Sequence, residues 1–363
     1  MALARSSVSL IIDKGAHDSP VTLINTRNDA IARACSGQPL PVVRLMLRSL
    51  LGLCPVAQCA ALEAAAGAAG LAAGEILRVA EPVQQLAAVE AVLETLRVLS
   101  LDLRSLVSRA HVSDANLKTI GALRAGLWQA SGRPKCAADE AASLYEQAAA
   151  LAMLWLTREK KTVGSIKSAY DRFEGMTLEG TKLLFPEELA SVTLLRFFYD
   201  ELERTPEFAL EPRLMGYRIP GALARLRSRY ESSTEARRDF SVKDLVVARL
   251  VELRHVAAGK PAPYTVYGVG LGENTGAGVV ETARGTLLHF VRREGETVAT
   301  LRIMAPTEWS FQAGSPLNQL MNRYAAERLS TPKTTETGLK MMSAAFDACT
   351  PVYIQWKRGE HHA

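Results

Sequence analysis

The residues of this chain best suited to metal or thiol chemistry lie in two stretches near its opposite ends. Cys54 and Cys59 fall in the stretch LCPVAQC, and Cys349 falls in the stretch FDACTP. Each stretch contains a proline, and a proline often marks the start or the end of a helix. Thiolates are ligands for soft and borderline metals. We therefore expect the fold to bring the two stretches together around one buried site.

Cys54 and Cys59 form a poor chelating pair by themselves. Five positions along a helix give a rotation of about 140° on its surface, so the two thiols do not share a face. The sequence has no C-x-x-C pair, which disfavours a zinc ribbon or a thioredoxin-like redox motif. The alternative for any one cysteine is a small buried hydrophobic side chain. Cys136 has no ligand-type neighbour, and His361 and His362 are interpreted as tail residues.

A glycine-rich stretch over 268–278, GVGLGENTGAG, could be mistaken for a phosphate-binding loop. No Walker lysine follows it, and the neighbouring pattern is strands without a crossover helix. Nucleotide binding is therefore disfavoured. We interpret the glycines as a close approach of the backbone to something buried.

Helices and one strand-rich region must position these residues. A short strand is expected over 7–12, and the apolar spacing after Pro41 predicts a helix that leads to Cys54. Pro55 then breaks that helix or opens the next one. A long helix is expected over 74–108, with a bend at Pro82. Two more are expected near 113–130 and 138–157, separated by a turn at 131–134. Later helices are expected over 186–203, after Ser241, over 316–329 and over about 335–348. After Pro263 the pattern predicts short strands with glycine turns, including a hairpin turn at 293–296.

Composition places the chain in a broad class. Hydrophobic residues make up 48% of it and charged residues 22%, so a sizeable core is expected. The net charge of +5 is spread without a basic block, which disfavours nucleic-acid binding and leaves room for an acidic protein partner. Five cysteines, an odd number, favour reduced thiols. No stretch approaches 18 strongly apolar residues, so we expect a soluble, cytoplasmic protein without membrane contact.

Four segments, taken together and in order, resemble the large subunit of nickel–iron hydrogenases. The family motif C-G-x-C-x-x-x-H corresponds to Leu51–Gln58, in which the glycine and Cys54 match. The motif D-P-C-x-x-C-x-x-H corresponds to Asp347–Gln355, in which the aspartate and Cys349 match. Between them, ETARG at 281–285 and PTEW at 306–309 resemble the family segments E-A-P-R-G and P-S/T-T-W.

The departures from the family are as informative as the matches. Two of the four nickel-binding cysteines are replaced by Leu51 and Val352, and neither side chain can ligate a metal. The resemblance therefore implies that no four-thiolate nickel site forms. An iron that carries two cyanides and one carbon monoxide needs at most three further ligands. Cys54 matches a cysteine that binds this iron, whereas Cys349 matches one that binds only nickel, so either Cys349 or the spare Cys59 would complete the iron site.

The resemblance also implies which residues touch the iron-bound diatomic ligands. A buried cyanide needs hydrogen-bond donors. Arg284 would supply a guanidinium and Thr307 a hydroxyl, with Pro306 beside it. The alternatives are a surface salt bridge for Arg284 and an ordinary strand-end residue for Thr307.

The family that fits these departures is the HoxV/HupK group of hydrogenase maturation proteins, which resemble truncated large subunits. The resemblance implies an α+β, mainly helical fold in a single domain over 1–363, with a helical body at about 40–260, a strand-rich insert at about 264–306 and C-terminal helices at about 315–350. It implies a non-catalytic scaffold that transiently holds an Fe(CN)2CO fragment, without nickel. A HypC-type chaperone would deliver the fragment, and a hydrogenase large subunit would receive it. The alternatives are a ligand-free docking protein and a catalytic oxidoreductase.

Overall fold

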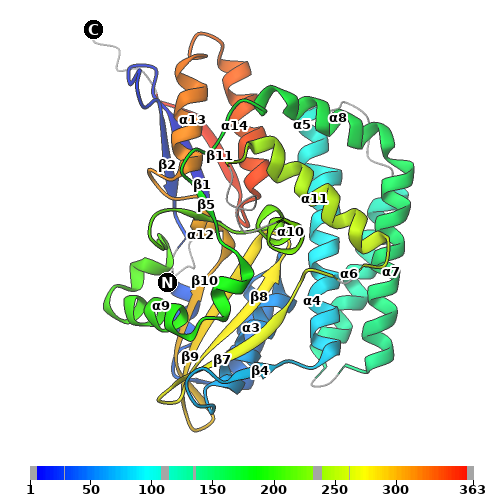
Figure 1. Cartoon of the computed structure of the whole chain (residues 1–363), viewed down its shortest axis with the longest axis vertical. Coiled ribbons are helices and arrows are strands. Elements are labelled where there is room, and N and C mark those ends of the chain that lie inside the picture. The colour runs from blue at the N-terminus through cyan, green and yellow to red at the C-terminus, as the bar shows by residue number, and fades with distance from the viewer. Residues whose placement is uncertain are drawn as a thin grey trace.

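A computed structural model describes residues 6–27, 29–107, 114–133, 136–231, 239–260 and 262–357 of this protein. Pro134 of the predicted turn and the tail residues His361 and His362 lie outside these ranges. Figure 1 shows a large sheet packed against α3, a group of helices beside it, and a small second sheet near the chain ends. Within the described ranges, no helix is both long and apolar enough to cross a bilayer.

The large sheet is antiparallel and has the strand order β3-β10-β9-β8-β7-β4. Its strands are β3 (Gln38–Pro39), β4 (Ile76–Arg78), β7 (Val266–Gly272), β8 (Thr275–Thr282), β9 (Gly285–Glu294) and β10 (Thr297–Met304). The four strands predicted after Pro263 are thus confirmed. The hairpin turn predicted at 293–296 is also confirmed, because Glu294 pairs with Thr297 across it.

Helix α3 (Pro55–Ala68) lies directly on this sheet, and it begins one residue after Cys54. Glycines of β7 and β8 face it at Gly268, Gly276 and Gly278, and Gly270 lies against Leu71 and Ala72 just after the helix. A Cβ atom at Gly278 would collide with the backbone carbonyl of Ala61, so only glycine allows this approach. The close approach interpreted from the glycine-rich stretch is therefore found, and the buried element is α3.

The opposite face of the sheet is covered by α9 (Val192–Arg204). Alternate residues of β8 point away from α3, and Ala277 and Val279 pack with Leu195 and Phe198 in one apolar cluster. This alternation is the period of two that a strand imposes. The sheet is therefore buried between two helices, which fixes the strand register and the turns at its ends.

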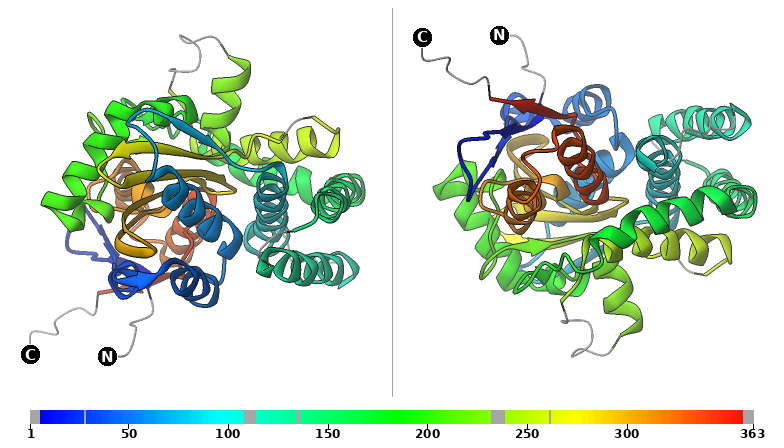
Figure 2. Two further views of the ribbon diagram at one scale, coloured as in Figure 1. Left: turned by 90° about the horizontal axis from the view of Figure 1, so that it is seen from below. Right: turned by 90° about the horizontal axis from the view of Figure 1, so that it is seen from above.

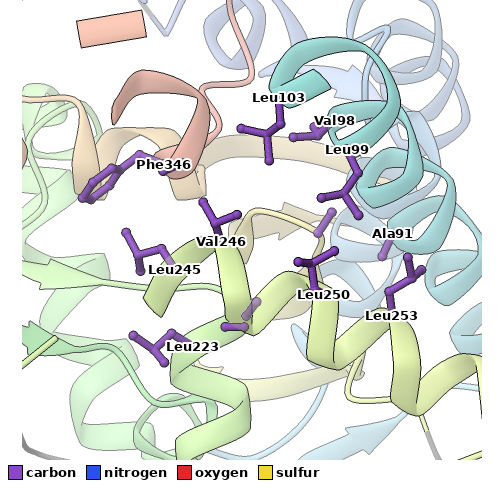
Figure 3. Close-up of a cluster of buried hydrophobic side chains, with 14 of the residues drawn as sticks. Ala91, Val98, Leu99, Leu103, Leu223, Leu245, Val246, Leu250, Leu253 and Phe346 are labelled. Atoms are coloured by element: carbon purple, nitrogen blue, oxygen red, sulfur yellow. The ribbon is translucent and has the colours of Figure 1, made fainter. Parts of the chain in front are cut away.

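The helices beside the sheet share a second core, of which Figure 3 shows a part. Leu245, Val246, Leu250 and Leu253 of α11 (Val242–Ala257) face Ala91 of α4 (Glu81–Arg97), Leu99 of the π-helical turn Val98–Leu103, and Phe346 at the end of α14 (Pro332–Phe346). Ser241 caps α11 as expected, because its hydroxyl accepts from the N–H of Asp244. The packing of Phe346 anchors the chain just before Cys349.

A three-stranded sheet joins the two ends of the chain. It contains β1 (Val8–Ile12), β2 (Val21–Asn25) and β11 (Val352–Trp356) in the order β11-β1-β2, and β1 runs parallel to β11. The predicted strand over 7–12 is confirmed, whereas β2 and β11 were not predicted. Figure 2 shows this sheet at the edge of the molecule where both chain ends emerge.

Two predicted helices differ from the structure. The helix predicted over 74–108 is wrong in its first part, because 76–78 form β4 and α4 begins only at Glu81. Pro82 lies in the first turn of α4 and does not bend a longer helix, which suits a residue without an N–H. The helix predicted over 186–203 is divided at Ser191, which caps α9 after a short 3-10 turn over Pro186–Ala190.

The remaining elements connect and cover these layers. The predicted helices at 113–130 and 138–157 are α6 (Asp114–Gly132) and α7 (Ala138–Arg158), the helix after Pro41 is α2 (Leu40–Leu50), and the two late helices are α13 (Pro316–Ala326) and α14. The others are α1 (Ala30–Cys35), α5 (Arg104–Val107), α8 (Lys160–Tyr170), α10 (Ala222–Tyr230), α12 (Pro306–Ser310), the strands β5 (Lys182–Leu183) and β6 (Arg218–Ile219), and 3-10 turns over Asp171–Phe173 and Pro206–Ala209.

Candidate functional site

The two thiol-bearing stretches meet at one cavity of about 730 Å³. Cys54 and Cys349 both line it, together with Arg284 and Pro306. Its volume lies in the range of small-molecule sites, roughly 300–1,000 Å³. Segments from both ends of the chain and from the large sheet therefore contribute to a single pocket, as the sequence predicted.

Cys54 is held at the start of α3. Its backbone forms the N-cap of the helix, and the carboxylate of Glu90 on α4 accepts the next two N–H groups, from Val56 at 2.9 Å and Ala57 at 2.8 Å. A carboxylate at a helix N-terminus satisfies unpaired donors and complements the helix dipole. Burial raises the pKa of Glu90 to about 7, although these two hydrogen bonds oppose the shift. Cys54 is thus anchored between the sheet and α4.

Gln58 replaces the histidine of the family motif and links Cys54 to the sheet. Its Nε2 donates to Cys54 Sγ at 3.7 Å, and its Oε1 lies 2.7 Å from Nε2 of His289 on β9. Burial, aided by the charge of Arg27, lowers the pKa of His289 to about 3, so the imidazole is neutral. A neutral imidazole that donates from Nε2 satisfies the Gln58 carbonyl.

Cys349 is positioned by the residues just before it. Asp347 ends α14 in the left-handed conformation, with φ of 51°. Its carboxylate accepts from Arg249 Nη1 at 2.8 Å and lies 3.4 Å from Arg284 Nε. Burial would raise the pKa of Asp347, but Arg284 and Arg249 outweigh it and hold the pKa below its usual range. The N–H of Cys349 itself donates to Thr307 Oγ1 at 2.9 Å.

Arg284 lies in the tight turn between β8 and β9 and is buried, with only 6% of its surface exposed. Its Nη2 donates to Glu94 at 2.9 Å. The alternative of a surface salt bridge is therefore wrong. Gly285 after it has φ of 131°, and a Cβ there would collide with Pro220, so the turn requires glycine.

Arg27 was not predicted as a site residue, yet it lines the cavity and contacts both Glu308 and Cys349. It follows β2, and its Nη1 donates to both carboxylate oxygens of Glu308, at 3.1 Å and 3.0 Å. The same Nη1 approaches Cys349 Sγ at 3.6 Å. Glu308 takes the place of a threonine in the family segment P-S/T-T-W. That departure was the one signal in the sequence that a buried cation lies nearby.

Cys59 lies apart from these residues. It lines a different pocket of about 340 Å³, beside Arg44, Glu63 and Cys136, and its Sγ contacts the carbonyl of Arg44 at 3.6 Å. Thr307 is not among the residues that line the large cavity, although its hydroxyl contacts Cys349.

Cys54, just before α3, and Cys59, within it, have raised thiol pKa values. Burial raises the pKa of Cys54 to about 12; Glu90 adds to this shift and Arg284 opposes it. Burial likewise raises the pKa of Cys59 to about 12. Metal binding to a thiolate must displace a proton, so occupancy of Cys54 by a metal would be coupled to proton release.

The arrangement suits a metal that arrives with ligands of its own. Among the described residues, no group of three or more His, Cys, Asp or Glu side chains could hold a bare metal ion. The cavity instead offers two thiols, the guanidiniums of Arg27 and Arg284, and an apolar wall that includes Leu287 and Ile303. The buried hydroxyl of Thr350 at its wall has no hydrogen-bond partner among the described residues.

Comparison with known proteins gives relatives of one kind. The chain is 28% identical over 340 residues to the hydrogenase expression/formation protein HupK of Azotobacter vinelandii, which covers 90% of each chain. It is 30% identical over 92 residues to the HupK protein of Bradyrhizobium diazoefficiens, a quarter of each chain. No model of a known protein family matches the sequence.

Solved structures with the same fold are hydrogenases. A NAD+-reducing nickel–iron hydrogenase in the H2-reduced state superposes with a TM-score of 0.61 at 16% identity, over 92% of this chain and 93% of the other. A nickel–iron–selenium hydrogenase from D. vulgaris Hildenborough gives a TM-score of 0.54 at 14% identity, over 91% and 92%. The resemblance to HupK proteins and the large-subunit-like, mainly helical α+β fold are confirmed.

Proposed function

We propose that this chain, a homologue of HupK with the fold of a hydrogenase large subunit, is a hydrogenase maturation protein that transiently holds an Fe(CN)2CO fragment. The observation that carries the proposal is the shared cavity, which Cys54 and Cys349 line together with the guanidiniums of Arg27 and Arg284. The fragment is cargo for this protein, which performs no catalysis of its own. We propose that it works in the cytoplasm.

Cys54 and Cys349 are the proposed iron ligands. Low-spin iron(II) takes six ligands, of which the three diatomic molecules fill three. Two thiolates would leave one position open, and a donor or acceptor protein needs such a position to exchange ligands. The location of Cys59 in another pocket supports Cys349 as the second ligand.

The proposed contacts to the diatomic ligands follow from charge. Arg284 is buried at the cavity, where its Nη2 donates to Glu94 and its Nε lies 3.4 Å from Asp347 without a hydrogen bond. Its Nη1 has no hydrogen-bond partner among the described residues and would donate to a cyanide. Thr307 and Pro306 remain predicted neighbours of the fragment.

Nickel is not part of the proposal. Leu51 lines the cavity at the position of one lost cysteine, and Val352 lines a neighbouring pocket at the position of the other. Without these two thiolates, a four-thiolate nickel site has half of its ligands. The catalytic oxidoreductase therefore has less support than the scaffold.

The proposed partners are a HypC-type chaperone as donor and a hydrogenase large subunit as acceptor. The support is that the relatives are hydrogenase expression/formation proteins. A ligand-free docking protein with the same partners is the second candidate. It differs in treating both cysteines as inert core residues.

One experiment separates these functions. The protein is purified from cells that synthesise the iron fragment, and its infrared spectrum and its iron and nickel contents are recorded. We expect cyanide and carbonyl stretches with iron and without nickel. Protein from cells unable to make the fragment is the control. Stoichiometric nickel would favour an enzyme, and the absence of both stretches and metal would favour the docking protein.

A further inference from the structure

We infer that Arg27 is a second recognition residue for the fragment and donates a hydrogen bond to one of its two cyanides. The inference rests on the proposed function and deepens it. Arg27 comes from the end of β2 and Arg284 from the turn between β8 and β9, yet both line the same cavity. Two guanidiniums from distant segments thus face one ligand space.

The contacts of Arg27 leave donors for a ligand. All of its described hydrogen bonds use Nη1, which contacts Glu308 and Cys349. Its Nη2 and Nε have no hydrogen-bond partner among the described residues. The side chain is 14% exposed and lines the cavity, so these N–H groups are the ones that a ligand there could use. Arg284 is held through other nitrogens: its Nη2 donates to Glu94, its Nε lies 3.4 Å from Asp347, and its Nη1 has no hydrogen-bond partner among the described residues.

Glu308 gives Arg27 its position. The carboxylate is 1% exposed, and both of its oxygens accept from Nη1 of the guanidinium. The ion pair at 3.0–3.1 Å therefore holds the cation in the cavity wall. A cation fixed in this way loses little conformational freedom when a ligand arrives.

The chemistry of the fragment matches two guanidiniums better than one. Cyanide nitrogen is an anionic acceptor and favours a charged donor, whereas carbon monoxide favours an apolar wall. The fragment has two cyanides and one carbon monoxide. Arg27 and Arg284 supply one charged donor for each cyanide, and Leu51, Leu287 and Ile303 supply apolar surface.

The test compares variants of the full chain purified from fragment-producing cells. In Arg27→Leu we expect the cyanide stretches to shift and iron occupancy to fall about tenfold or more, as the loss of a charge-assisted hydrogen bond implies. Arg204→Leu is the matched control, because Arg204 pairs with Glu201 on the surface of α9 and neither residue lines the cavity. The double variant Arg27→Leu/Glu308→Leu removes the buried carboxylate that the single variant leaves unpaired, and it should show the same loss while remaining folded.

The outcomes separate this inference from the proposed function. One outcome would overturn the role of Arg27 alone. In it, wild-type protein shows cyanide stretches, and the stretches and iron occupancy of Arg27→Leu and of the double variant equal those of Arg204→Leu. Wild-type protein without stretches or iron would overturn the proposed function and this inference with it. A shift and loss confined to the two Arg27 variants would support both.

Discussion

Among single residues, His289 makes the least expected contribution to the site. It is fully buried on β9, 2.7 Å from the Gln58 side chain that contacts Cys54, and its Nδ1 has no hydrogen-bond partner among the described residues. A buried imidazole between an amide and the cation Arg27 is costly to protonate. The neutral form is therefore part of the folded structure.

This gives a prediction for the pH dependence of stability. The unfolded chain protonates His289 below its ordinary pKa of about 6.5, whereas the folded pKa is about 3. The unfolded state then binds more protons, so the free energy of unfolding falls as pH falls, by about 2 kcal/mol from this residue between pH 6.5 and 5. Urea unfolding of wild type and His289→Gln, which keeps a donor for Gln58, measures the difference. The exposed His17→Gln is the control, and identical pH slopes in wild type and His289→Gln would contradict the prediction.

Sequence motifs identified the site residues that match a family pattern. They missed the ion pair between Arg27 and Glu308, which matches no family pattern. Cys54, Cys349, Arg284 and Pro306 all line the cavity. Arg27 was missed because its partner Glu308 lies at the far end of the chain, and no local pattern pairs residues so distant. The same distance hid the contact between Thr307 and the Cys349 N–H.

At the scale of elements, the contact between α3 and the glycine strands positions Cys54. Helix α3 is buried on nearly all sides, with alanines toward β7 and β8. Small residues on both surfaces let the helix axis come close to the sheet. Any side chain added to the strand face would lift α3 and move Cys54 away from Cys349.

We predict that Gly278→Ala destabilises the protein by about 1–3 kcal/mol, as overpacking does, because its Cβ would meet the Ala61 carbonyl. Gly164→Ala in α8 is the matched control, since nothing lies within 4 Å of a Cβ there. That helical change should be neutral or stabilising by up to about 1 kcal/mol. Chemical denaturation of the two variants checks this, and equal midpoints would argue against the close approach.

Helical spacing of apolar residues predicted most helices, and short runs separated by glycine turns predicted the four-strand region. Sequence patterns failed where a strand forms only because it pairs with a strand distant in the sequence. Strand β4 forms because its three residues pair with the edge of β7, and β11 forms because it pairs with β1. A proline such as Pro82 can bend a helix or lie in its first turn. Here β4 precedes it, so Pro82 lies in the first turn of α4.

At the scale of the whole molecule, the site exists because both ends of the chain fold together. Strand β11 begins three residues after Cys349 and runs parallel to β1, whose sheet also contains β2 and so delivers Arg27. The turn between β8 and β9 carries Arg284, and the start of α3, held by Glu90 of α4, carries Cys54. A pocket assembled from such distant segments depends on the complete fold.

The most direct measurement of this arrangement is the infrared spectrum of four proteins purified from fragment-producing cells: wild type, Cys54→Ala, Cys349→Ala and Cys59→Ala. We predict cyanide and carbonyl stretches in wild type and Cys59→Ala, and their loss in Cys54→Ala and Cys349→Ala, with all four proteins equally folded by circular dichroism. Stretches that persist in Cys54→Ala, or that vanish only in Cys59→Ala, would contradict the claim that Cys54 and Cys349 together hold the iron.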